Sequence, residues 1–281
     1  EMHLVEAKND VMRARMPYSE SEQKLAMLII SRINPTKEKF DVYRFRIADV
    51  LETLKMGQKN YAYFYQIADG LLSNPIKIKL PDGRIYQSNI IVDATYSEDR
   101  TTVDITMSDK MQAYLLQMND GGYTKFYLSN ILGLTSKYSM AMYRYLKSFE
   151  AMKVVTKPID ELRFSLGLEH EYQNFYDFRK NVLIPAQLEL EEKTDIRFDY
   201  QLEKRRKKVI RITFSISANE VGRLTILQMQ KSLLEKAVDE KAEAIQKIKK
   251  TAKTPRKSKS DVAEAVKKSL SEAAANEPDL F

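Results

Sequence analysis

Side chains that commonly catalyse reactions or bind metals are scarce in this sequence. It contains no cysteine and two histidines, His3 and His170, which stand far apart along the chain. Thiol nucleophiles, thiolate metal sites and sites that need a close histidine pair, such as HExxH, are therefore excluded. Neither GxxxxGKS/T nor GxGxxG occurs, so the common glycine-rich phosphate loops are absent as well. We expect no catalytic residues, no metal and no cofactor, and hence a protein that is not an enzyme.

Two remaining candidates for catalysis are weak. His170 stands between Glu169 and Glu171, a setting typical of a solvated loop. Sixteen tyrosines are present, but none has neighbours that mark it as an activated nucleophile for cutting DNA. A nicking enzyme would need such a tyrosine together with metal ligands, so we set that class aside.

A dense cluster of basic residues indicates an acidic partner such as DNA. Six positive charges face a single acid, Glu203, within nine residues. Such a loop can neutralise DNA phosphates, which gives an affinity that falls as salt rises. The alternative is an ordinary solvated turn. The basic residues are Lys204, Arg205, Arg206, Lys207, Lys208 and Arg211.

A helix expected over residues 174–193, upstream of this cluster, has side chains suited to reading DNA bases. Its apolar stripe of Phe175, Phe178 and Val182 leaves amide, hydroxyl and basic groups on the outer faces of the first turns. Such groups pair with base edges in the major groove, which admits one helix. A solvated amphipathic helix is the competing interpretation. The candidate DNA contacts are Asn174, Tyr176, Asp177, Arg179 and Lys180.

The surrounding elements follow the order of a winged-helix module, in which helices precede a β-hairpin. Helices are predicted at residues 125–134, 139–149, 159–166 and 174–193, and a hairpin at 195–201 and 209–217, with the basic cluster at its tip. A similar order comes earlier in the chain. It has helices at 19–34, 47–56 and 59–72, and strands at 40–47, 76–80, 85–96 and 101–107.

The earlier copy is the weaker candidate for DNA binding. The last of its helices offers Lys59, Asn60, Tyr63 and Gln66 as contacts. The tip of its final hairpin, at 97–100, includes two acids and is a poor phosphate clamp. We expect that hairpin to serve association between modules or between chains instead.

Five apolar or aromatic positions recur at a constant offset of 112 residues and support an internal repeat. Two unrelated α+β stretches are the alternative. The positions Ile47, Val50, Leu54, Tyr63 and Leu71 correspond to Ile159, Leu162, Leu166, Phe175 and Leu183.

We therefore predict an α+β protein with two tandem winged-helix domains and a flexible basic C-terminal tail. Residues 1–17 form a leader, 18–118 the first domain (dimerisation and DNA contact), 119–218 the second domain (main DNA reader), and 219–281 a helical, basic and mobile tail. Residues 244–260 hold seven lysines and arginines and no acid. This stretch is either a non-specific DNA tether or a solubilising linker.

Charge and hydropathy agree with a soluble DNA-binding protein. The net charge is +7 and the isoelectric point about 9.2, which favours acidic partners. The longest apolar run, residues 25–30, is far too short to span a bilayer, and no secretory signal is visible at the start. We expect a cytoplasmic location and no membrane contact.

Residues 5–217 resemble the iteron-binding plasmid replication initiators, the family of the F-plasmid initiator. The most specific part is YQNFYDFRKNVLIPAQLEL at 172–190, followed by the Thr-Asp-Ile at 194–196 and the basic hairpin. Residues 134–147 are similar to the helix that opens the family's second module, and residues 5–10 resemble its leader. By this resemblance, Arg179 and Lys180 match positions that read the groove, whereas Lys59, Asn60 and Gln66 match loosely.

The resemblance implies a sequence-specific initiator of plasmid replication that takes part in copy control. Monomers would bind directly repeated double-stranded sites at the plasmid origin and help melt an adjacent AT-rich stretch. Homodimers, paired mainly through the first module, would be inactive or repress the protein's own gene. The host replicative helicase or its loader is the implied partner. The alternative is a tandem winged-helix transcriptional regulator without a role in initiation.

The last five residues, EPDLF at 277–281, resemble the Gln-x-Asp/Ser-Leu-Phe peptide by which bacterial proteins dock on the sliding clamp. Leu280 and Phe281 would fill an apolar pocket while the tail provides reach. Glu277 stands where glutamine is usual. We therefore predict Asp279, Leu280 and Phe281 as contacts to a sliding clamp.

Overall fold

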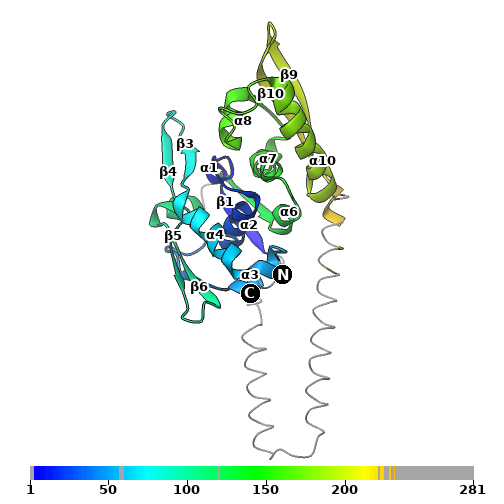
Figure 1. The fold of residues 1–281 in the computed structure, drawn as a ribbon. Helices are drawn as coiled ribbons and strands as arrows, with labels where there is room; N and C mark the ends of the chain where they lie inside the picture. Colours follow the sequence, from blue (N-terminus) through cyan, green and yellow to red (C-terminus); the bar gives the residue numbers. More distant parts are fainter. Residues whose placement is uncertain are drawn as a thin grey trace, which may run out of the picture. The chain divides into compact units, whose positions relative to one another are not determined.

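Two three-stranded antiparallel sheets with the same strand order form the framework of the chain (Figure 1). In the first sheet, β6 (Thr102–Met107) lies between β2 (Val42–Arg46) and β5 (Ile91–Tyr96). In the second, β10 (Lys208–Ala218) lies between β8 (Val154–Pro158) and β9 (Ile196–Arg205). The computed structural model describes residues 3–56, 60–118, 121–220 and 222–224, together with residues 228 and 231.

In each module, helices lie along the chain between the first two strands of its three-stranded sheet, β2 and β5 in the first module and β8 and β9 in the second. In the first module these are α3 (Ile47–Thr53) and α4 (Tyr61–Ser73). In the second they are α8 (Ile159–Leu166) and a long helix made of α9 (Phe175–Phe178), a π turn (Arg179–Leu183) and α10 (Ile184–Lys193). A further helix precedes each set, α2 (Glu20–Ile30) in the first module and α7 (Lys137–Lys147) in the second.

This arrangement confirms two tandem winged-helix modules of α+β class. The predicted offset also holds, because β2 and α3 begin at Val42 and Ile47, 112 residues before β8 and α8 begin at Val154 and Ile159. A strand and the helix after it are thus repeated in register, which excludes two unrelated stretches. The predicted tail, apart from its first few residues, lies outside the described residues.

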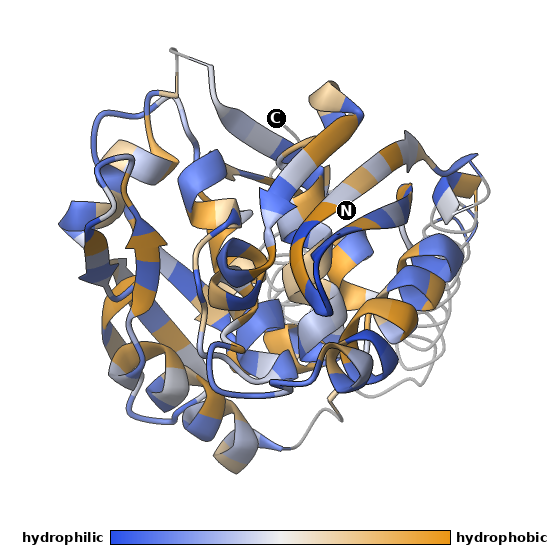
Figure 2. Cartoon of the chain, turned by 90° about the horizontal axis from the view of Figure 1, so that it is seen from above, coloured by the Kyte–Doolittle hydropathy of each residue, from blue (hydrophilic) through white to orange (hydrophobic). Residues whose placement is uncertain are grey.

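Helix α2 shows why the sequence folds as predicted at this point. The Ser19 side chain accepts a hydrogen bond from the Glu22 N–H, and the Glu22 carboxylate accepts one from the Ser19 N–H at 2.6 Å. This capping box satisfies two N–H groups that would otherwise be unpaired. Residues 25–30 then lie buried, in contact with α4 and α7. Apolar and polar positions alternate along the helices and strands in Figure 2.

The helix predicted at 125–134 is wrong in its first half. Residues Tyr123–Tyr127 form β7, which pairs antiparallel with β1 (Leu4–Lys8), and α6 is confined to Ser129–Leu132. Thr124 and Phe126 are buried while their neighbours are exposed, which is the two-residue period of a strand. β1 lies in the predicted leader, and its partner lies beyond residue 118; the domain boundaries remain a prediction.

The single strand predicted at 85–96 is two strands that belong to different sheets. β4 (Ile85–Ser88) pairs with β3 (Ile76–Lys79) in a separate hairpin, and the chain turns at Asn89 before β5. Asn89 donates a side-chain hydrogen bond to the Leu72 carbonyl, which fixes that turn. The remaining short helices are α1 (Asn9–Met12), α5 (Gln112–Leu115) and the 3-10 turns Asp109–Met111 and Glu150–Met152.

Three arginines join the segment before α2 to the second module. Arg13 donates to the Ser148 hydroxyl at 2.8 Å and lies 3.8 Å from the centre of the Phe149 ring. Arg15 pairs with Glu169 at 2.6 Å. The side chain of Arg144 on α7 is fully buried and donates to the Met12 carbonyl and to Gln23. The two modules are therefore joined by directional contacts as well as by apolar packing.

The end of the second module is fixed by an asparagine. The Asn219 amide donates to the carbonyls of Glu191 and Thr194, and its oxygen accepts from the Gly222 N–H at 3.2 Å. Gly222 leaves no room for a side chain, since a Cβ there would lie 1.9 Å from the Thr194 carbonyl oxygen. Among the described residues, no helix has the length and apolar character needed to cross a membrane.

Candidate nucleic-acid interface

The long helix of the second module presents a polar, basic face. Asn174 caps its start, accepting a hydrogen bond from the Tyr176 N–H at 3.0 Å. Phe178, Val182 and Leu183 are buried. The side chains of Arg179, Lys180 and Asn181, three consecutive residues in the first half of the helix, are all exposed. The candidate contact Asn174 thus has a structural role as the cap, and Asp177 is half-buried.

A π turn interrupts this helix where the candidate base contacts Arg179 and Lys180 lie. Pro185 has no N–H to donate to the carbonyl of Asn181, four residues before it, and its ring crowds that turn. The chain takes the wider turn over Arg179–Leu183, in which hydrogen bonds join residues five apart. Turns of this kind often lie at functional sites.

Arg179 is held in place by the wing. Its Nε donates to the hydroxyl of Tyr200 on β9 at 3.0 Å. This contact uses Nε alone, so the two terminal nitrogens of the guanidinium group remain as a pair of donors, and two parallel donors are what a guanine O6/N7 edge accepts. Tyr200 therefore positions the side chain that is best suited to read a base.

A second arginine braces the loop that leads into the helix. Arg163 on α8 donates to the carbonyls of Glu171 and Tyr172 at 2.9 and 2.7 Å, and its guanidinium lies 4.7 Å from the centre of the Phe178 ring. Burial lowers the pKa of Arg163 from its ordinary value. The Arg163 guanidinium is used in these contacts with the loop and Phe178. It therefore fixes the direction of the helix and is not itself a candidate DNA contact.

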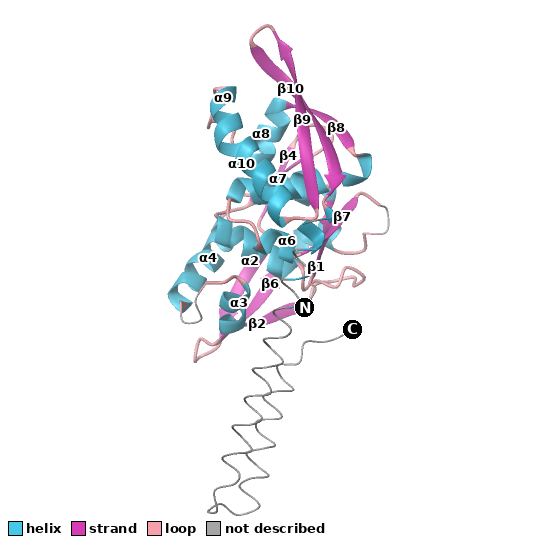
Figure 3. Cartoon of the chain, turned by 90° about the vertical axis from the view of Figure 1, so that its right-hand side faces the viewer, coloured by secondary structure: helices cyan, strands magenta, loops and turns pink. Residues whose placement is uncertain are grey.

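The basic cluster lies on a long hairpin that extends beyond the helices (Figure 3). We expected a five-residue loop, but the turn contains only Arg206 and Lys207, because Lys204 and Arg205 end β9 and Lys208 begins β10. All five side chains are exposed, and Arg206 adopts φ 57°. Arg211 is also exposed, with its Nε 3.8 Å from the Glu203 carboxylate. The cluster is thus a charged tip with basic residues on both strands.

The first module has a parallel but less basic site. Asn60 caps α4 by accepting from the Tyr63 N–H at 3.3 Å, the role that Asn174 has in the second module. Tyr63 is half-buried, with its hydroxyl 2.8 Å from that of Ser21 on α2, whereas Gln66 is exposed. The predicted contact Lys59 lies outside the described residues.

The tip of the first wing is acidic, as the sequence indicates. Glu98, Asp99 and Arg100 are exposed between β5 and β6. Hydrogen bonds from the Ser97 hydroxyl and from Thr101 lower the pKa of Asp99, so this carboxylate stays charged at neutral pH. A fixed negative charge at this tip opposes phosphate binding.

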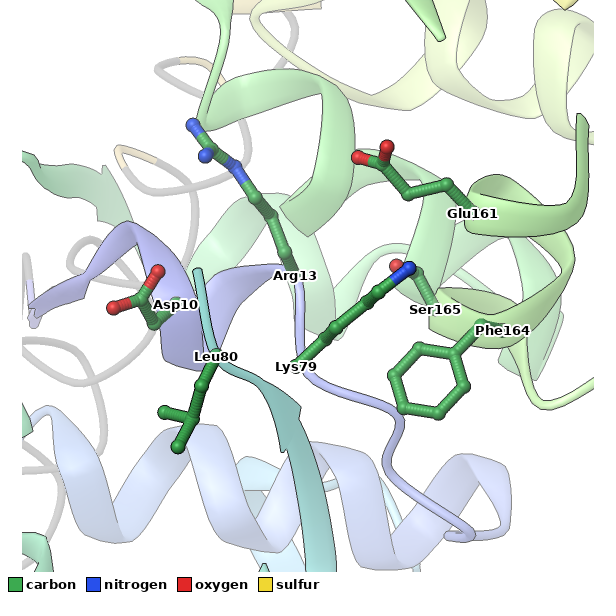
Figure 4. A pocket seen from close by; sticks show the side chains of 7 residues that line it. All are labelled: Asp10, Arg13, Lys79, Leu80, Glu161, Phe164 and Ser165. Carbon is green, nitrogen blue, oxygen red and sulfur yellow. The ribbon is translucent and has the colours of Figure 1, made fainter. Parts of the chain in front are cut away.

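A small cavity of about 190 Å³ beside α1, β3 and α8 is a weaker candidate site (Figure 4). Asp10 and Glu161 balance the charges of Arg13 and Lys79 around it, so it offers no excess charge to an anion. Burial lowers the pKa of Arg13, which is already bound to Ser148. Among the described residues, no group of three His, Asp or Glu side chains could hold a metal ion.

Three residues of the second module that lie at or near the candidate site were not predicted from the sequence. Asn181 and Ile184 are exposed on the same helix as Arg179, and Tyr200 contacts Arg179 from the wing. Asn181 directly follows Arg179 and Lys180, and this run of polar residues in the sequence could have indicated it. The contact between Tyr200 and Arg179 joins two elements, and nothing in the sequence pattern reports it.

Fold and site together define a tandem winged-helix protein whose second module has a helix with exposed basic residues and a basic wing. Two family models match the chain, "Initiator Replication protein, WH1" over residues 4–147 and "Initiator Rep protein, WH2" over residues 158–216. The first alone covers just over half of the chain. The protein belongs to this family of replication initiators, which confirms the resemblance seen in the sequence.

Individual relatives are distant. A "Replication initiation protein" of Escherichia coli is 24% identical over 195 residues, which are 65% of this chain and 60% of the relative. The chain thus spans three fifths of the length of that relative. The crystal structure of the Pi initiator protein in complex with iteron DNA superposes with a TM-score of 0.67 at 17% identity, covering 78% of this chain and 98% of the other. That similarity establishes the shared fold.

Proposed function

We propose that the protein binds directly repeated double-stranded sites at a plasmid origin and initiates replication there. The observation that carries the proposal is the run of three exposed polar residues, Arg179, Lys180 and Asn181, on one helix, in a module whose wing ends in five exposed basic residues. Membership of the initiator family supports it, as does the fold shared with an initiator that was crystallised with iteron DNA.

The mechanism is binding without catalysis. The long helix of the second module enters the major groove with its first turns toward the base edges, and the wing lies along the phosphates. Bending and unstacking the neighbouring duplex costs several kcal/mol, more than one protomer readily supplies. Several protomers on adjacent repeats share that cost, which explains why the sites would be repeated.

The first module has the less basic surface, and we assign it a supporting role. Gln66 and the α4 face add contacts to DNA, and the module pairs two copies of the chain in a dimer that cannot initiate. The host helicase or its loader would be recruited by monomers on the origin, in the cytoplasm where plasmids replicate. The alternative of a regulator alone predicts derepression, without loss of plasmid maintenance, when Arg179 is replaced.

Selection of binding sites from a randomised duplex pool at about physiological salt tests the proposal. Non-specific affinity is low under these conditions, so enrichment reports base reading. We expect one long asymmetric site spanning about two major-groove turns, present as direct repeats at a plasmid origin. No enriched sequence, with binding lost on adding salt, would contradict sequence-specific recognition.

Removing charge from the wing should weaken binding to every sequence equally. In a variant with Lys204→Gln, Arg205→Gln and Lys207→Gln, the slope of log K against log salt should become shallower by about 2–3, since each phosphate contact contributes about 0.9. Arg206 stays in place because its positive φ belongs to the turn. Fluorescence anisotropy over a salt series measures the slope.

The matched control replaces Arg32, Lys39 and Lys110, exposed basic residues outside both wings, with glutamine, and so also removes three charges. Its salt slope should match the wild type. The sequence selected by the wing variant should stay the same, since phosphate contacts carry no base information. A changed selected sequence would show that the wing reads bases.

The predicted clamp peptide at 277–281 and the basic stretch at 244–260 lie outside the described residues, and both stay proposals from the sequence. Deleting residues 277–281, with Asp279, Leu280 and Phe281, should abolish binding to purified sliding clamp in surface plasmon resonance and leave DNA affinity unchanged. Clamp binding that persists in the truncated chain would disprove this contact.

A further inference from the structure

The long helix of the second module exposes apolar side chains beside its basic ones. Tyr176, Ile184 and Leu188 are 64%, 36% and 63% exposed, so three of the large exposed hydrophobic residues in the described chain lie on this one helix. Ile184 begins α10, directly after the π turn. An exposed isoleucine at the end of a basic helix face suggests an apolar contact within a charged interface.

The π turn sets which neighbours Ile184 has. Because its hydrogen bonds join residues five apart, Ile184 follows Arg179 on the same face of the helix. Lys180, four residues before Ile184, lies next to it. The isoleucine side chain is therefore placed one turn along the helix from the side chain that is best suited to a guanine edge.

DNA offers one apolar group to a helix in the major groove, the C5 methyl of thymine. We propose that Ile184 contacts a thymine methyl group about one or two base pairs from the base read by Arg179, the offset that one helical turn of about 5.4 Å sets along a duplex with about 3.4 Å per base pair. This inference rests on the proposed function.

The charges around the exposed residues favour Ile184 over Leu188 as the methyl contact. Ile184 has Arg179 and Lys180 in the turn before it, and both attract the duplex. Leu188 is one turn further on, where Glu191 and Glu192 are exposed and repel phosphates. The DNA-facing stretch therefore ends between these two residues. Leu188 provides a matched control, since it is apolar, more exposed and on the same helix.

Deoxyuridine differs from thymidine by the loss of that methyl group alone, so a thymine-to-uracil scan tests the proposal. Each thymine of the selected site is replaced in turn, and affinities are measured by fluorescence anisotropy. For the wild type, one replacement should weaken binding about three- to fivefold, the effect of losing one buried methyl group. Ile184→Ala should bind the thymine and uracil duplexes equally at that position, and Leu188→Ala should discriminate as the wild type does.

The outcomes separate this inference from the proposed function. Ile184→Ala should still unfold in one cooperative transition and keep the wild-type affinity for random duplex, which shows that the fold and wing are intact. If the wild type selects a site but is indifferent to uracil throughout, or if Ile184→Ala still discriminates, the methyl contact is wrong and the proposed function stands. If the wild type selects no site, both are wrong.

Discussion

Replacing Arg179 with alanine should lower affinity for the selected site by about ten- to a hundredfold and leave affinity for random duplex almost unchanged. A bidentate arginine–guanine contact contributes about 1–3 kcal/mol of discrimination against other bases. Arg179 is exposed, and its Nε is held by Tyr200 at 3.0 Å, so little ordering remains to be done when DNA binds. Competition binding with selected and random duplexes measures both affinities.

The same variant should also relax the base preference at one position of the selected site. The wing variant is the natural comparison, because loss of phosphate contacts weakens both duplexes in parallel. If Arg179→Ala weakened selected and random duplexes by the same factor, Arg179 would be a phosphate contact and the reading of bases would have to lie elsewhere.

Arg144→Ala should lower the free energy of unfolding by about 3 kcal/mol, more than any other substitution proposed above. The Arg144 guanidinium donates to the Met12 carbonyl at 3.2 Å and to Gln23 at 3.3 Å, with the side chain fully buried. Alanine would leave these acceptors without that donor and open a cavity between α7 and the segment before α2. Urea unfolding followed by circular dichroism measures the loss.

Arg144→Met gives the matched comparison and should lose clearly less stability than the alanine variant. Burial lowers the pKa of Arg144 to about 10, which reflects the cost of holding a cation away from water. Methionine fills most of the volume and removes that cost, as hydrophobic replacements of buried charges often do. Equal losses in the two variants would show that the hydrogen bonds, and not the packing, determine the stability here.

The repeat could be predicted because its positions are set by local patterns. The capping box at Ser19 and Glu22 and the apolar spacing that begins at Ile47 and Ile159 each report on one short segment. The run Tyr123–Tyr127 contains Tyr, Thr and Phe, which favour strands, but it is only five residues long, and the β1 partner that makes it β7 lies more than a hundred residues away. Local propensity carries no information on that partner.

The candidate site also combines features that the local sequence predicts with features that depend on contacts between elements. Exposure of Arg179 and Lys180 follows from helical spacing alone, and the basic wing from composition. The capping role of Asn174 was open to prediction, because asparagine is favoured at that position. The contact between Arg179 and Tyr200 required the relative position of helix and wing, and the face taken by Ile184 required the π turn, which Pro185 causes through an interaction with the turn before it.

The arginine contacts between the modules have a consequence for the geometry of the DNA. Two DNA-binding modules joined by a flexible linker could bind half-sites at many separations. Each module would then have a low effective concentration at its own half-site. Here Arg13, Arg15 and Arg144 hold the segment before α2, and Gln23 of α2, against the second module. On the proposed DNA site the two modules would then lie at a fixed separation, and an insertion of one base pair between the half-sites would turn the second out of phase by about a tenth of a helical turn. For the proposed direct repeats, the length of each repeat would therefore be constrained as strictly as its sequence.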